Sequence, residues 1–192
     1  MSNQSQMVLA AVIYAAGNEQ DGYRFYLEAA RHIKDSRGSQ MFRGLADDEV
    51  KHYQILMANH ASLKAGGGWL TLDAALAAAV TPIEQAVLEL PADTAGLVPQ
   101  QRLFPHAASV MAAIDAGAGD LEAVDLAIAA EKRGYDLYAR AAAEATDGNA
   151  KTAYHMLMQE EARHYDWLQR SRGYLAASNT YWDESELPFF EG

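Results

Sequence analysis

The sequence predicts an all-α protein, a four-helix bundle of two helical hairpins joined by a long crossover that contains short helices. Two observations support this prediction. Four long stretches repeat apolar or small residues at alternating steps of three and four, the period of an amphipathic helix. The first pair of stretches also recurs 112 positions later as the second pair, and 12 of the 38 positions from Glu19 to Leu56 carry the same residue in both copies.

The first hairpin is expected to consist of helices at about 7–34 and 39–64. The apolar stripe of its first helix contains Glu19, which places a carboxylate on the buried side. The segment Asp35–Ser39 is polar and contains a glycine, as is typical of a turn. Ser39 is the expected N-cap of the second helix, because a serine hydroxyl can accept from the first free backbone amides.

The crossover is expected to span residues 65–119, which hold four of the five prolines of the chain. Thr81 and Pro82 resemble a helix start, with the proline at the first helical position. A connection of this length suits a bundle whose second and third long helices run parallel. The segment is expected to contain three short helices, at about 72–79, 82–90 and 107–116.

The second hairpin is expected to consist of helices at about 120–146 and 150–176, separated by a turn rich in Asp, Gly and Asn. The tail, residues 179–192, mixes aromatic and acidic residues, and we expect it to dock on the bundle or on a neighbouring subunit. The whole chain, residues 1–192, has a length that suits one domain with one core.

The composition excludes several classes of protein. The chain has no cysteine, which rules out disulfides, thiolate zinc sites, iron–sulfur clusters and a nucleophilic thiol. Its formal net charge of -11 argues against a nucleic-acid partner, because such binding needs clustered Lys and Arg. Neither a signal peptide nor a membrane span is expected from the first residues, so the default prediction is a cytoplasmic protein.

Six residues of metal-ligand type follow the repeat. In each copy a lone Glu is followed 30 residues later by Glu-x-x-His, and the spacing of three puts that pair on one helix face. In each hairpin these residues lie about 15 residues from the turn, roughly 22 Å along the bundle at ~1.5 Å per residue, so four helices can present them at one level. The six, called the hexad below, are Glu19, Glu49, His52, Glu131, Glu161 and His164.

The chemistry of the hexad predicts two metal ions. Four carboxylates in apolar stripes would be costly to bury while ionised and unpaired, so a counter-charge is required. Two divalent cations balance four carboxylates, and two neutral imidazoles can give one nitrogen ligand to each metal. Oxygen and nitrogen ligands without sulfur suit iron or manganese. We therefore expect two iron ions, with manganese or a mixed pair as the alternative.

Three further pairs of residues recur beside the hexad. Gly22 and Gly134 lie inside helices, where glycine is unfavourable, and we expect them to clear space beside the metals for dioxygen or peroxide. Four tyrosines follow the lone glutamates by four and seven positions. They either pack in the core with satisfied hydroxyls or donate hydrogen bonds that orient the carboxylates. They are Tyr23, Tyr26, Tyr135 and Tyr138.

Four segments together resemble the rubrerythrin branch of the ferritin-like diiron-carboxylate superfamily: Asn18–Tyr26, Asp47–His52, Ala130–Tyr138 and Gln159–His164. The resemblance covers the four long helices, roughly 110 residues. It implies a ferritin-like four-helix bundle with a carboxylate-bridged diiron centre. The roles that it implies are bridging or chelation for Glu49 and Glu161, terminal ligation for Glu19 and Glu131, and one iron each for His52 and His164.

The resemblance implies an enzyme, a diiron oxidoreductase that reacts with peroxide or dioxygen. Rubrerythrins carry a cysteine-ligated rubredoxin domain, which this chain lacks, so a separate electron-donor protein or reductant is expected. They also carry a further carboxylate where this chain has Gly134. The alternative is an iron-binding or storage protein with ferroxidase activity, and a less favoured one is an oxygenase acting on an organic substrate. A homodimer or larger homo-oligomer is expected.

Overall fold

The computed structural model describes residues 3–88, 102–105, 119–178 and 180–181. These residues form helices and connections, with no strand in the described ranges, so the prediction of an all-helical bundle is confirmed. Within them, no helix has the length and apolar character needed to cross a membrane. The helices in chain order are α1 (Asn3–His32), α2 (Ser36–Lys64), α3 (Leu72–Ala77), α5 (Gly119–Glu144) and α6 (Gly148–Ser178).

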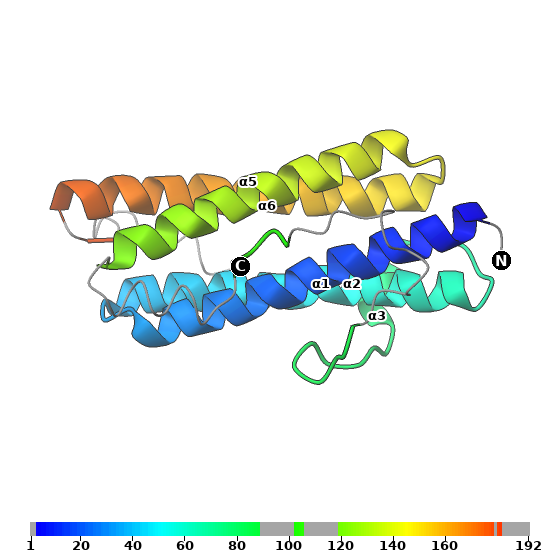
Figure 1. Ribbon diagram of the computed structural model, residues 1–192, viewed down its shortest axis with the longest axis horizontal. Coiled ribbons are helices and arrows are strands. Elements are labelled where there is room, and N and C mark those ends of the chain that lie inside the picture. Colours follow the sequence, from blue (N-terminus) through cyan, green and yellow to red (C-terminus); the bar gives the residue numbers. More distant parts are fainter. Residues whose placement is uncertain (1–2, 89–101, 106–118, 179, 182–192) are drawn as a thin grey trace.

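The four long helices form two antiparallel hairpins that lie on one another, α1 with α2 and α5 with α6 (Figure 1). In this view α2 and α5 run in the same direction along the bundle. The short helix α3 lies outside the first hairpin, and Gln54 of α2 holds its C-terminal end by donating to the carbonyls of Ala75 (2.9 Å) and Ala78 (2.6 Å). The expected first and last residues of each long helix lie within about four residues of the observed ones.

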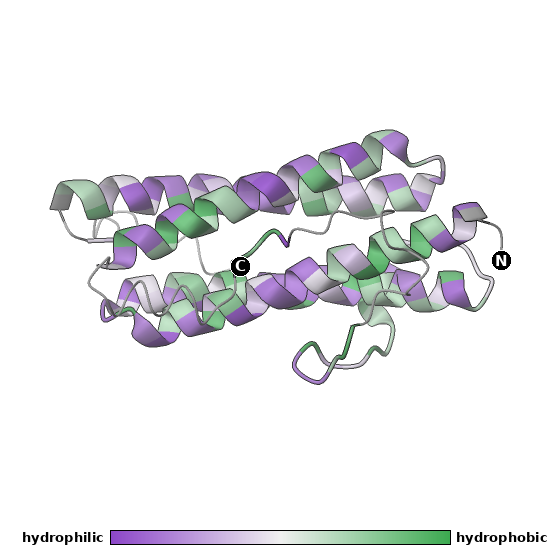
Figure 2. Ribbon diagram, viewed as in Figure 1, coloured by the Kyte–Doolittle hydropathy of each residue, from purple (hydrophilic) through white to green (hydrophobic). Residues whose placement is uncertain are grey.

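The core consists mainly of two apolar clusters, one toward each end of the bundle. One contains Phe25, Phe42 and Leu168, and the other contains Leu56 and Leu157. On every long helix the hexad residues fall between a residue of one cluster and a residue of the other. Each long helix is mixed in hydropathy along its ribbon (Figure 2), as expected for helices with one buried face. The hexad therefore forms a polar layer enclosed by two apolar ones.

The N-cap of α2 is Asp35, and the prediction of Ser39 was wrong. The Asp35 carboxylate accepts hydrogen bonds from the backbone amides of Arg37 (2.8 Å) and Gly38 (3.3 Å). Aspartate is at least as good an N-cap as serine, and here it lies one turn earlier in the chain. The Ser39 hydroxyl instead donates to the carbonyl of Ala30 (2.7 Å) and ties α2 to the end of α1.

The described part of the crossover holds one of the three expected short helices, which is α3. Residues 82–88 are not helical, so the helix expected at 82–90 is wrong over that range. The reason is a long-range competitor: the Gln20 side chain donates to the carbonyls of Ile83 (2.6 Å) and Ala86 (2.9 Å) and holds this segment as a turn on α1. The helix expected at 107–116 lies outside the described residues.

Two residues of the tail, 180 and 181, are described. Tyr181 is fully buried, and its ring occupies the space where a side chain at Gly38 of α2 would begin. A larger residue at position 38 would displace this ring. At this point the tail docks on the bundle, as expected.

Candidate metal centre

The structure brings all six hexad residues together in the middle of the bundle. They come from four helices, and none is more than 3% exposed to solvent. Helix α1 contributes Glu19 and α5 contributes Glu131, whereas α2 and α6 each contribute a Glu and a His one turn apart. Such burial of ionisable side chains is rare unless they are paired or bind a cation.

His52 lies at the centre of a group of three carboxylates. Its Nδ1 atom is 3.1 Å from Glu19 Oε2, 3.4 Å from Glu49 Oε2 and 3.4 Å from Glu161 Oε1. One ligand atom from each of these four residues lies within 4.8 Å of all the others. Side chains from three helices therefore converge on a volume the size of one cation site.

A second group lies beside the first. Its members are Glu49, Glu131 and His164, whose ligand atoms also lie within 4.8 Å of one another. His164 Nδ1 is 3.6 Å from Glu131 Oε2, and the His164 ring is stacked on that of His52 with centroids 5.6 Å apart. Because Glu49 belongs to both groups, these two candidate cation positions are neighbours that share a carboxylate; a third group, His52, Glu160 and His164, meets the same distance limit.

Burial and crowding of charge shift the protonation of the site. Burial raises the pKa of Glu49 well above its usual value, and the Glu19 carboxylate raises it further. Burial and the Glu131 carboxylate do the same to the pKa of Glu161. Burial alone would lower the pKa of His52, but the surrounding carboxylates outweigh it and raise that pKa well above its usual value. Protons thus supply the positive charge that this layer needs when no metal is bound.

Several ligand atoms of the site are buried and have no hydrogen-bond partner among the described residues. They are both carboxylate oxygens of Glu49, Oε2 of Glu131 and Nδ1 of His164. An unsatisfied buried polar group costs about 1–3 kcal/mol, and more if it is charged. A metal ion bound to these atoms would remove that penalty. The donor set therefore fits a cation.

Two tyrosine hydroxyls hold the lone glutamates across the hairpins. Tyr26 on α1 donates to Oε1 of Glu131 on α5, and Tyr138 on α5 donates to Oε1 of Glu19 on α1. Burial, followed by the nearby glutamates, raises the pKa of both tyrosines well above its usual value, so both hydroxyls stay protonated and can donate. These contacts agree with the orienting role considered for the two residues.

The other two tyrosines of the pattern lie away from the carboxylates. The Tyr23 hydroxyl donates to Glu84 of the crossover (2.8 Å), and Tyr135 is 38% exposed. Tyr23 thus takes the alternative of packing against the core with a satisfied hydroxyl, and Tyr135 lies largely outside the core. Helix geometry is the reason. Seven residues fall about 20° short of two full turns, whereas four residues overshoot one turn by about 40°. Tyr26 and Tyr138 therefore face the site more directly.

Gly22 and Gly134 make room for carboxylates, and the expectation that they also clear space for dioxygen or peroxide stays a prediction. A Cβ atom at Gly134 would lie 2.7 Å from Glu161 Oε2. A Cβ atom at Gly22 would lie 3.1 Å from Glu49 Oε1 and 2.8 Å from the ring of Phe104. Each glycine lets the glutamate of the neighbouring helix lie directly against its backbone.

Asp48 is a site residue that the hexad pattern missed. Its Oδ2 atom is 3.2 Å from Nε2 of His164, on the opposite side of that ring from Glu131. Burial would raise the pKa of Asp48, but bonds to His164 and Lys51 (2.7 Å) keep it well below its usual value. The carboxylate is therefore ionised and can hold His164 by its Nε2–H, which leaves Nδ1 free to ligate.

The repeat did contain a signal for Asp48. Its counterpart 112 positions later is Glu160, also an acid, and Lys51 corresponds in the same way to Arg163. Arg163 forms ion pairs with both Asp48 and Glu160 and so links the two copies. A search for identical residues overlooks this match, whereas a search for conserved charge would have found it.

A pocket of about 460 Å³ lies beside the two histidines, between α2, α3 and α6. His52 lines it, together with the charged residues Asp48, Glu160 and Arg163. Trp167 also lines it, packed against His164 with ring centroids 6.1 Å apart. The metal centre therefore approaches solvent on its histidine side.

The described residues thus contain buried groups of Glu and His that could hold a metal ion. Comparison of the chain with protein families, with curated proteins and with solved structures found no match.

Proposed function

We propose that this chain is a non-haem diiron oxidoreductase of the rubrerythrin type that uses peroxide or dioxygen as its oxidant. The observation that supports the proposal is the buried layer of four carboxylates and two imidazoles, in which Glu49, Glu131 and His164 keep ligand atoms without a hydrogen-bond partner among the described residues. The imidazole nitrogens lie 3.4 Å from Glu49 Oε2 and 3.6 Å from Glu131 Oε2, so these ion pairs leave the polar atoms without the hydrogen bonds that buried groups normally have.

In the proposed centre, Glu19 and His52 hold one iron, Glu131 and His164 hold the other, and Glu49 and Glu161 lie between them. The sharing of Glu49 by both ligand groups supports the arrangement. Two divalent ions balance the four carboxylates, and the mixed oxygen and nitrogen donors suit iron, with manganese as the alternative.

The proposed architecture is the ferritin-like bundle, in which residues 65–119 are the long connection from the first hairpin to the second. In Figure 1, α2 and α5 run in the same direction, which supports this connection. When two consecutive long helices are parallel, the chain needs a long segment to return from the end of one to the start of the next. The chain is proposed to act as a homodimer or larger homo-oligomer.

The residues around the hexad would bind, orient and shield the centre. Bound iron would supply electrons and a Lewis acid. The Tyr26 and Tyr138 hydroxyls keep Glu131 and Glu19 in place, and Asp48 fixes the tautomer of His164. The apolar clusters on both sides exclude water. Metal binding would release the protons held on His52 and the glutamates, because ligands must be deprotonated.

The experiment that tests the proposal is anaerobic loading of the protein with ferrous iron, followed by rapid mixing with hydrogen peroxide and, separately, with dioxygen. We expect oxidation of about two irons per chain with at least one of the oxidants, and renewed activity when a reductant is added. Iron that neither oxidant oxidises faster than free ferrous iron would contradict the proposal.

Storage with ferroxidase activity is separated from this function by size and metal content. A storage protein forms a closed shell that holds many irons per chain, whereas the proposed enzyme holds about two in a small oligomer. Size-exclusion chromatography with iron analysis of the eluted protein distinguishes them. A large shell that holds many irons per chain would contradict the oxidoreductase proposal and support the storage function.

A further inference from the structure

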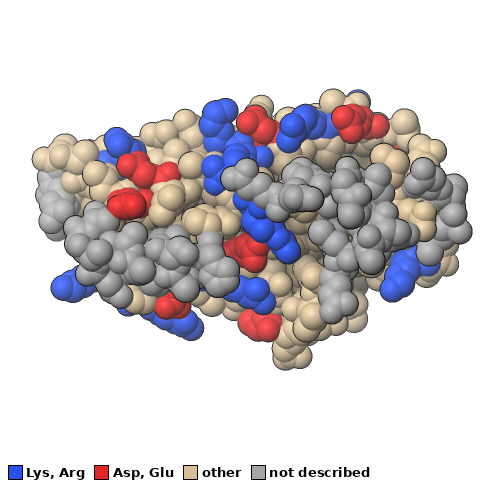
Figure 3. Space-filling view, viewed as in Figure 1, with Lys and Arg blue, Asp and Glu red and all other residues tan. Residues whose placement is uncertain are grey.

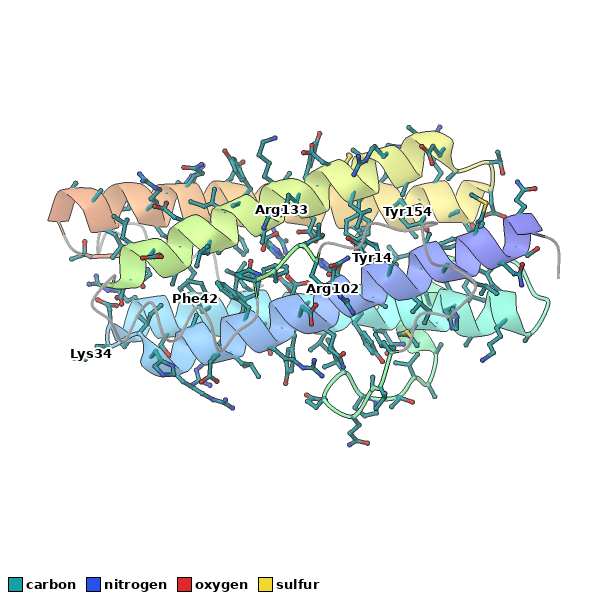
Figure 4. All side chains as sticks on the ribbon, in the orientation of Figure 1. Tyr14, Lys34, Phe42, Arg102, Arg133 and Tyr154 are labelled. Carbon is teal, nitrogen blue, oxygen red and sulfur yellow. The ribbon has the colours of Figure 1, made fainter. Side chains whose placement is uncertain are left out.

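Residues 102–105 of the crossover form a strap that lies between α1 and α5, on the face of the molecule shown in Figure 4. The backbone amide of Leu103 donates to Asn18 on α1 (3.1 Å), and its carbonyl accepts from Arg133 on α5. Arg102 pairs with Asp21 of α1 at 3.4 Å. Figure 3 shows basic side chains gathered over the middle of the same face. The strap is thus anchored to both hairpins.

The strap inserts one aromatic ring into the bundle. Phe104 is 7% exposed and packs against Phe25 and Tyr26, with ring centroids 5.6 Å and 5.4 Å away. Its ring edge also reaches Gly22, where a Cβ atom would lie 2.8 Å from Phe104 Cε2 and 3.1 Å from Glu49 Oε1. Phe104 and Glu49 therefore both lie against Gly22, and the Glu49 oxygens have no hydrogen-bond partner among the described residues.

The two sides of the metal centre consequently differ. On the α2–α6 side, the pocket reaches His52, whose Nδ1 faces the carboxylates, so an imidazole stands between the pocket and the remaining ligands. On the α1–α5 side, an apolar ring lies against Gly22, the glycine that Glu49 also approaches. An oxidant that approaches the centre from this second side has to fit beside the Phe104 ring.

We propose that Phe104 is a specificity-determining residue that limits the oxidant to molecules as small as hydrogen peroxide or dioxygen and excludes bulky organic hydroperoxides. This inference rests on the proposed function. Reduction of a hydroperoxide breaks its O–O bond, takes one electron from each of two ferrous ions and two protons from solvent, and yields an alcohol and water. The balance is the same for every hydroperoxide, so selection among them is a matter of space.

The first test uses the metal-free protein. Phe104→Ala should open a cavity lined by the rings of Phe25 and Tyr26, and apolar cavities of this kind bind small aromatic molecules. We expect toluene to raise the Tm of Phe104→Ala by roughly 2–4 °C and to leave the wild-type Tm unchanged. Phe104→Leu, which keeps an apolar side chain, provides a second variant if the alanine variant does not fold. Absence of a toluene effect in the folded variant would overturn the proposal.

The second test compares oxidants on anaerobically iron-loaded protein. The wild type should react much faster with hydrogen peroxide than with cumene hydroperoxide. Phe104→Ala should raise the rate with cumene hydroperoxide relative to hydrogen peroxide by roughly tenfold or more. Phe42→Ala is the matched control, because Phe42 is also a buried ring of the same cluster and meets Tyr26 from α2. That control should keep the wild-type preference.

Equal wild-type rates with both peroxides, or an equal change in the Phe42 variant, would overturn the inference and leave the proposed function standing. A wild-type protein that no oxidant oxidises would overturn the proposed function. In that case the toluene test on metal-free protein still decides whether Phe104 fills the space beside Gly22.

Discussion

Each of the two glutamates between the proposed metals lies against a glycine of its hairpin partner. Glu49 on α2 meets Gly22 on α1, and Glu161 on α6 meets Gly134 on α5. Glycine inside a helix costs about 1 kcal/mol relative to alanine, yet here a methyl group would overlap a carboxylate oxygen. The glycines therefore lower the stability of their helices but allow the glutamates to lie where they can act as ligands.

Substitution of Gly134 tests whether the glycine is needed for the position of Glu161. In Gly134→Ala the new Cβ atom would lie 2.7 Å from Glu161 Oε2, so the carboxylate must turn away. We expect iron affinity to fall by roughly 10–100-fold, as for other residues that position ligands. The matched control is Gly173→Ala in α6, where no atom of the described part of the chain that could clash lies within 4 Å of the new atom.

The control should raise the free energy of unfolding of the metal-free protein by about 1 kcal/mol and leave iron binding unchanged. Urea unfolding and anaerobic iron titration measure the two effects. Equal iron affinity in both glycine variants would contradict the role assigned to Gly134.

Asp48 is expected to act on metal binding through His164. Asp48→Ala removes the acceptor of the His164 Nε2–H and should weaken iron binding by roughly 10–100-fold at one of the two positions. Asp48→Asn keeps an acceptor oxygen and should restore part of the affinity. Asp47→Ala, an exposed neighbour, serves as the control. If Asp48 had only a general structural role, Asp48→Ala would weaken iron binding equally at both positions, and Asp48→Asn would restore none of the affinity.

At the scale of the element, α5 shows why an apolar stripe can misplace a helix face. The spacing of apolar residues in this helix predicts a buried stripe of Leu121, Val124, Ile128, Glu131, Tyr135, Tyr138 and Ala142. The structure buries Val124, Glu131, Tyr138 and Ala142 but leaves Leu121, Ile128 and Tyr135 partly buried or exposed. In their place the inward side holds further small residues. Such residues contribute little to a hydropathy pattern but allow close approach of helices. They are Ala123, Ala127, Ala130 and Gly134.

The start of α2 gives a prediction about pH. Burial would raise the pKa of Asp35, but hydrogen bonds from Arg37 and from the amide of Gly38 lower it below its usual value. A lowered pKa stabilises the folded state fully above the unfolded value of about 3.9, and this contribution is lost as pH falls through the folded value. Asp35→Ala should therefore cost about 1 kcal/mol at neutral pH and less in acid.

Urea unfolding of wild type and Asp35→Ala at about pH 7 and about pH 3 measures this change. Asp35→Asn is the control, because its side chain can cap the helix but does not titrate in this range. A penalty for the alanine variant that stays the same at both pH values would show that the charge of Asp35 does not contribute.

At the scale of the whole molecule, the repeat explains how much could be predicted. The offset of 112 and the turns near residues 35 and 147 place the hexad at one level, and the structure gathers all six residues there. The contacts of the crossover could not be predicted from the sequence, because they join residues that are far apart in the chain and follow no repeating pattern. Gln20 with Ile83 and Phe104 with Gly22 are of this kind.

The central claim is that the hexad holds two irons, and the most direct test is the iron content of the chain after anaerobic titration with ferrous iron. We expect about two irons per chain in the wild type and clearly fewer in Glu161→Ala and in His164→Ala. His155→Ala, which alters an exposed histidine of the same helix, should keep two. Unchanged iron in both hexad variants, or no saturable binding in the wild type, would contradict the claim.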